Sequence, residues 1–162
     1  MKRGRLSSLI AAALVGVAGF ACGGGGGSST SSPTQPSTPT SSTNITGTWN
    51  GSAYDSAGNA SGPGSMTWQV TQTGASFSGT MTVTDIGTNV TGRGTVSGSV
   101  SGTSIQFSMA VPAGGFDSPY GSCTANVTGA GVAATTSING NYTGSSSCAG
   151  AIGSGLLTLI KQ

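Results

Sequence analysis

The residues that could carry out acid–base or metal chemistry are few and widely spaced in this 162-residue chain. There is no Glu and no His, and the only carboxylates are Asp55, Asp85 and Asp117. General acid–base catalysis, nucleophilic triads and nitrogen-ligated metal sites draw on His, Glu or clustered Asp. The sequence therefore predicts a protein that is not an enzyme and that uses no metal and no cofactor.

Basic residues are equally sparse. After residue 5 only Arg93 and Lys161 are basic, so the net charge of +2 comes from Lys2, Arg3 and Arg5 at the N-terminus. Nucleic-acid binding requires a basic stripe or patch. We therefore expect no nucleic-acid partner.

The N-terminal segment predicts export. The three bases precede an apolar run over residues 6–21, which is shorter than the roughly 20 residues of a membrane-spanning helix and is typical of a signal peptide. Ala21-Cys22 at its end resembles the lipobox of bacterial lipoproteins. That resemblance implies removal of residues 1–21, acylation of Cys22 and a lipid-anchored place in the cell envelope. The alternative is ordinary cleavage after Ala21, which would leave a free thiol.

The three cysteines fit this interpretation, because an odd cysteine in an exported protein needs an explanation. Cys123 and Cys148 can form a disulfide in the oxidising compartment that export provides, and Cys22 is left for the lipid. Closing the loop between Cys123 and Cys148 is expected to stabilise the fold by about 3 kcal/mol.

Beyond Cys22 the chain divides into two parts. Residues 22–43 are almost entirely Gly, Ser, Thr and Pro, which cannot bury an apolar face and predict a disordered tether. Residues 44–162 are long enough for one domain with one core.

Within that domain, apolar and polar residues alternate with period two, which is typical of half-buried strands. We expect eight strands, over residues 45–53, 66–71, 77–84, 90–100, 105–111, 123–127, 138–142 and 155–161. Consecutive short hairpins favour an antiparallel up-and-down barrel over a sandwich. The polar residues of each strand are expected to face outward, whereas a membrane barrel has apolar residues on its outer face. If Cys123 lies opposite Cys148, partners in the sixth and seventh strands have numbers that sum to 271.

Gly47-Thr48-Trp49 near the start of the first strand, with Lys161 at the end of the last, resembles the pattern of calycins, the group that includes lipocalins and avidins. The resemblance implies that Trp49 closes the base of an eight-stranded barrel and that Lys161 packs across it. Avidin-like sequences place a ligand-contacting Asn two residues after this Trp. Gly51 has that position here, so biotin binding is not expected.

The barrel interior could be a filled core or could hold one small ligand. Seven large side chains have inward parity and are the candidate ligand contacts: Met66, Trp68, Phe77, Met81, Phe107, Met109 and Tyr142. Inward glycines add no volume, and we expect them to leave room for a pocket: Gly47, Gly51, Gly79, Gly92, Gly94, Gly98 and Gly140.

The up-and-down topology gathers the three aspartates at one end. Asp55, Asp85 and Asp117 fall in different connections at the end opposite Trp49, which we call the mouth. The longest connection, residues 112–122, adds Phe116 and Tyr120, and loops often carry function. The aspartates could be solvated turn residues, and the connection over residues 112–122 could be a lid packed over the barrel end. Alternatively, the aspartates could form an acidic rim that binds a cation or a basic partner.

Two functions follow from this sequence. The first is a lipid-anchored barrel, monomeric, that binds a small apolar ligand in its interior without catalysis. The alternative is a surface or periplasmic module with a filled barrel that binds another envelope protein through the mouth loops.

Overall fold

The computed structural model describes residues 42–57 and 62–162. The predicted signal peptide, Cys22 and nearly all of the tether lie outside these residues. The described chain forms eight strands: β1 (Gly47–Ala57), β2 (Gly62–Thr73), β3 (Ser76–Asp85), β4 (Thr91–Ser101), β5 (Ser104–Val111), β6 (Ala125–Ala133), β7 (Ser137–Ser146) and β8 (Gly150–Lys161). Within it, no helix has the length and apolar character needed to cross a bilayer.

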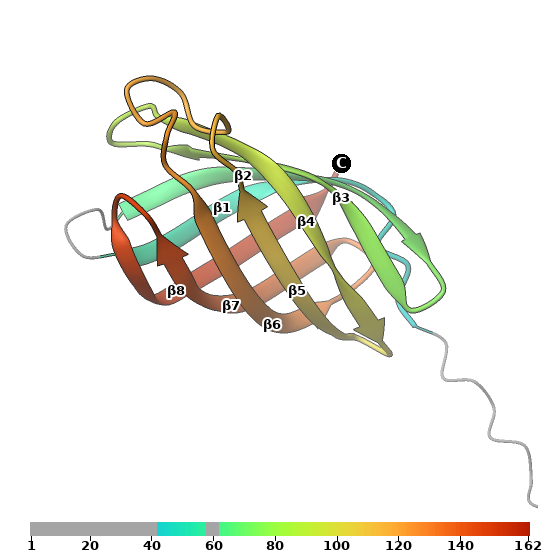
Figure 1. The fold of residues 1–162 in the computed structure, drawn as a ribbon. Helices are drawn as coiled ribbons and strands as arrows, with labels where there is room; N and C mark the ends of the chain where they lie inside the picture. The colour runs from blue at the N-terminus through green and yellow to red at the C-terminus, as the bar shows by residue number, and fades with distance from the viewer. Residues whose placement is uncertain (1–41, 58–61) are drawn as a thin grey trace, which may run out of the picture. The chain divides into compact units, whose positions relative to one another are not determined.

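The strands follow one another around a single closed antiparallel barrel, as Figure 1 shows. Each strand pairs with its neighbour in sequence, and β8 pairs with β1 to close the sheet. The predicted fold class is confirmed: the described chain is an all-β, eight-stranded, up-and-down barrel.

The alternation predicted from the sequence sorts side chains between the interior and the outer surface. Met66, Trp68 and Val70 of β2 are buried, whereas Gln69 between them is exposed. In the last strand, expected over residues 155–161, apolar residues occupy both faces, so the sequence did not show which of them point inward. The structure turns Leu157 inward at 2% exposure and leaves Leu156 outside at 59%.

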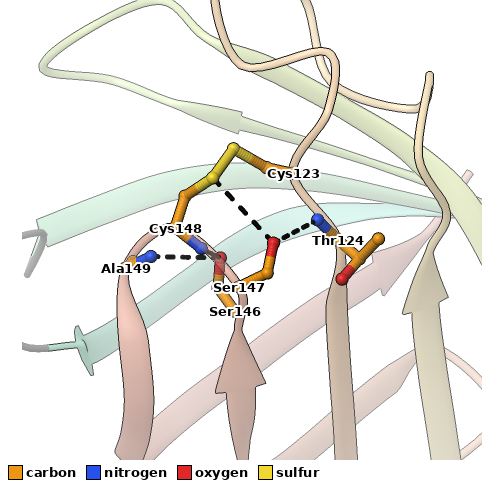
Figure 2. The surroundings of a disulfide bond; sticks show 6 residues. All are labelled: Cys123, Thr124, Ser146, Ser147, Cys148 and Ala149. Carbon is orange, nitrogen blue, oxygen red and sulfur yellow. Dashed lines mark hydrogen bonds between the residues drawn. A yellow bond between two sulfur atoms is a disulfide. The ribbon is translucent and has the colours of Figure 1, made fainter.

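The β6–β7 hairpin has the predicted register. Its partners run from Ala125↔Ser146 to Ala133↔Ile138, and every pair sums to 271. Cys123 and Cys148 continue this register beyond the strands and form a disulfide with their Cα atoms 5.7 Å apart. In Figure 2 the bond joins the segment before β6 to the β7–β8 turn, where the Thr124 backbone N–H donates to Ser147 Oγ at 2.9 Å. The disulfide therefore closes the hairpin at the mouth.

The end opposite the mouth is closed by Trp49. Its side chain is fully buried, and its indole Nε1–H donates to the carbonyl of Ile45 at 2.8 Å. Lys161 Nζ lies 5.4 Å from the centroid of the Trp49 ring, the cation–π contact that the calycin-like pattern implied. The Thr43 backbone N–H donates to Gly102 in the β4–β5 turn at 2.8 Å. The chain therefore enters the barrel at its closed end.

The seven inward glycines that were expected to leave room for a pocket instead lie against backbone or side-chain atoms of neighbouring strands and loops. A Cβ at Gly51 would overlap the backbone of Thr158 in β8, and one at Gly79 would overlap the carbonyl of Gln69 in β2. A tightly closed barrel brings neighbouring backbones this near, which only a residue without a Cβ tolerates. None of the seven glycines expected to leave room for a pocket lines the cavity described next.

Candidate functional site

The mouth half of the barrel holds a cavity of about 790 Å³ that is open to solvent. Met66, Met81 and Met109 project into it from β2, β3 and β5, and these three residues are called the methionine floor below. Met side chains are flexible and polarizable and adapt to irregular apolar surfaces. Above the floor the wall is mainly apolar, with Ala53, Val83, Val111, Ala125, Val127 and Ile152. The cavity can therefore accommodate an apolar molecule without demanding one fixed shape.

Below the methionine floor, buried aromatic side chains pack against one another in the barrel interior. The Trp68 ring lies 5.3 Å from Phe107 in an edge-on arrangement and 6.4 Å from Phe77. The indole Nε1–H of Trp68 donates to Met66 Sδ at 3.2 Å. Of the seven candidate ligand contacts, Met66, Met81, Met109 and Tyr142 line the cavity, whereas these three aromatic residues do not.

Tyr142 and Asp55 form a hydrogen-bonded polar pair on the cavity wall. The Tyr142 hydroxyl donates to Asp55 Oδ2 at 3.3 Å, linking β7 to β1. Burial raises the pKa of Asp55; the Tyr142 hydrogen bond acts against this rise and the charge of Asp85 adds to it. The pKa of Tyr142 is raised well above its usual value, first by burial and then by the Asp55 charge.

Asp85 also lines the cavity, at the end of β3. Its Oδ1 accepts hydrogen bonds from the backbone N–H and hydroxyl of Thr88, at 2.7 Å and 2.9 Å, which fix the β3–β4 turn. Asp55 and Asp85 are separated by β2, where Gly62 pairs with Asp55 and Gly64 pairs with Asp85. The two carboxylates thus flank a strand segment whose inward positions are glycines.

The β5–β6 connection reaches back toward β4 and brings aromatic residues to the cavity. Phe116 forms a bridge with Gly92, and its ring covers the place where a Cβ of that glycine would lie. The Arg93 backbone N–H donates to the Gly115 carbonyl at 2.8 Å, which holds the segment against β4. Phe116 and Tyr120 line the cavity, and Tyr120 is also exposed to solvent.

Asp117, the third predicted rim residue, faces away from the cavity. Its Oδ1 accepts a hydrogen bond from Arg93 Nη1 at 2.6 Å on the exposed side of β4. This contact with Arg93 holds the pKa of Asp117 below its usual value. Of the three predicted rim aspartates, only Asp55 and Asp85 line the cavity.

Several cavity residues were not singled out in the sequence, among them Val83, Val111 and Ile152. Val83 and Val111 have inward parity, but parity does not reveal how deep a residue lies along the barrel axis. Ile152 has the opposite parity to Leu157 and is turned inward by the register shift between Tyr142 and Gly144. The signal that could have found them is their position at the mouth end of a strand or within two residues of it. No group of three potential metal ligands is present in the described part of the chain.

Neither family models nor curated proteins nor solved structures give a match to this chain.

Proposed function

We propose that this chain is a lipid-anchored protein of the bacterial cell envelope that binds a small apolar ligand in the mouth half of its barrel, without catalysis. The observation that carries the proposal is the cavity of about 790 Å³ above the methionine floor. Binding sites for small molecules are typically concavities of roughly 300–1,000 Å³ with mainly apolar walls and a few polar groups. This cavity has that size and composition.

The disulfide and the β5–β6 connection support a pre-formed site. Cys123, Cys148, Phe116 and Tyr120 all line the cavity, so the elements that define its entrance are held by a covalent bond and by β4. A site that is shaped before binding loses less conformational entropy when its ligand arrives.

The alternative, a module that binds another envelope protein through the mouth loops, assumed a filled barrel. An apolar space of this size favours the ligand-binding proposal over that alternative. Anchoring through Cys22 is compatible with either function, because the chain enters the barrel at the closed end, opposite the mouth.

A blocking substitution tests the proposal. Val127 points into the cavity from β6, and the next residue, Thr128, is exposed on the outer face. We expect a neutral apolar probe, N-phenyl-1-naphthylamine, to bind the full chain and the Thr128→Trp variant but not the Val127→Trp variant. Circular dichroism checks that both variants fold. Equal binding by two folded variants would place the probe outside the barrel and count against the proposal.

A further inference from the structure

We propose that the ligand of this cavity is an amphiphile with a positively charged head group, such as an alkylammonium, whose head lies between Asp55 and Asp85 and whose chain lies over the methionine floor. This inference rests on the proposed function and adds the chemical class of the ligand.

The charge on the cavity wall has one sign. Asp55 and Asp85 are the charged residues among those that line it, and both are acidic. The two bases of the described chain lie elsewhere: Arg93 is paired with Asp117 on the outer face, and Lys161 covers Trp49 at the closed end. Neither base is therefore available to compensate the carboxylates that face the cavity.

The space between the two carboxylates is open at Gly62, whereas a Cβ at Gly64 would lie 3.1 Å from the carbonyl oxygen of Thr84. The two carboxylates flank β2 at Gly62 and Gly64, whose inward positions carry no side chain. A Cβ built at Gly62 would meet no atom within 4 Å. A head group can therefore approach both aspartates without displacing a side chain of the intervening strand.

The surroundings favour a cation over a neutral or anionic head. Asp55 is half-buried and hydrogen-bonded to Tyr142, a neutral donor, and a partly desolvated carboxylate gains most from an opposite charge. Phe116 and Tyr120 line the same cavity, and aromatic faces attract ammonium groups. An anionic head would instead meet two carboxylates of its own sign.

Three probes with the same alkyl chain test this class: decyltrimethylammonium, decanol and decanoate. Each is titrated below its micelle concentration at neutral pH, in competition with N-phenyl-1-naphthylamine. The full chain carries Cys22→Ser so that no detergent is needed. We expect the ammonium to bind on the order of 10-fold more tightly than decanol, and decanoate to bind more weakly than both.

Three single variants and one double variant distinguish the cavity carboxylates from general surface charge. Asp55→Asn and Asp85→Asn keep the side-chain shape and one acceptor oxygen. Each should reduce the preference for the ammonium over decanol, and the double variant should lose it. Asp117→Asn removes the same charge outside the cavity and should keep the preference.

The outcomes separate this inference from the proposed function. If decanoate binds as tightly as the ammonium, or if the double variant keeps the preference, the cationic class is wrong while binding of apolar chains stands. If none of the three probes binds at all, the proposed function fails together with it.

Discussion

The ring of Tyr142 occupies the space that a side chain at residue 155 would need. Tyr142 and Gly155 are direct partners in the β7–β8 ladder, and a Cβ on Gly155 would overlap the ring. The same relationship recurs across neighbouring strands for Phe77 with Gly98 and for Phe107 with Gly129. Each of these three rings occupies the space beside a glycine that carries no side chain, which allows large side chains to fit inside a narrow barrel.

Gly155→Ala should therefore destabilise the fold by about 1–3 kcal/mol, because the added methyl group overpacks against Tyr142. Gly153, two residues earlier in β8, provides a matched control: a Cβ there would meet no atom within 4 Å. Gly153→Ala should be neutral or stabilise by up to about 1 kcal/mol, because it restricts the unfolded chain. Chemical denaturation of both variants measures the difference, and equal effects would contradict the packing role of Gly155.

These ring–glycine pairs show what the sequence could and could not reveal. Period-two alternation placed Phe77, Phe107 and Tyr142 inside the barrel, and the Cys123–Cys148 pair fixed the β6–β7 register. Alternation reports the face of the sheet but not the depth along the barrel axis. Depth depends on the stagger between all eight strands, which no local pattern contains.

Because depth along the barrel axis could not be predicted, the residues that line the cavity were predicted only in part. Trp68 and Met66 are two residues apart on one strand and share inward parity, yet Met66 lines the cavity whereas Trp68 lies below it. Likewise, Asp117 falls in a mouth connection as expected, but only the folded path of residues 112–124 turns its carboxylate toward Arg93. In β8 apolar residues lie on both faces, so its sequence shows no alternation from which the inward face could be predicted.

Cys123 and Cys148 should be joined by a disulfide in the native protein, and this bond should stabilise the fold. Replacing both Cys123 and Cys148 by Ser should lower the free energy of unfolding by about 2–4 kcal/mol, mainly because the unfolded chain regains entropy. Denaturation of the native protein with and without a reducing agent provides the measurement. Titration of two reactive thiols in the native protein would be inconsistent with the bond.

Stability should fall as the pH rises through the titration of Asp55. Burial raises the folded-state pKa of Asp55 above the ordinary value of 3.8, with Tyr142 and Asp85 as the polar and charged groups facing it. The folded state therefore holds its proton at a pH where the unfolded state has lost it, and the stabilisation present below pH 3.8 is lost above the folded-state pKa. Asp117 has the opposite effect on stability, because its folded-state pKa is lowered. Its stabilising contribution is present above pH 3.8 and is lost as the pH falls below that value.

Unfolding free energies measured from pH 3.5 to pH 7 should show this fall in the native chain and a flatter profile in Asp55→Asn. Asp117→Asn is the matched control and should keep the fall. Parallel profiles for the native chain and Asp55→Asn would assign the dependence to another group.

Lipid anchoring makes a separate prediction about Cys22. If acylation at this residue provides the membrane attachment, Cys22→Ser should move the protein from the membrane fraction to the soluble fraction of the cell envelope. Fractionation followed by immunoblotting measures this, with Cys148→Ser as a control that changes a cysteine without removing the anchor. Membrane association that is unchanged in Cys22→Ser would end the lipoprotein hypothesis.

Trp68 should report on occupancy of the cavity, although it does not line it. Its indole N–H donates to the sulfur of Met66, so a ligand that displaces the methionine floor alters the surroundings of the ring. Trp49 lies at the closed end against Ile45 and Lys161 and should not respond. Because these are the only two tryptophans, Trp49→Phe and Trp68→Phe each leave one emitter. Titration with decanol should change the emission of Trp49→Phe and leave that of Trp68→Phe constant, while displacement of N-phenyl-1-naphthylamine shows that both variants bind. A response from Trp49 alone would place the ligand at the closed end instead of the mouth.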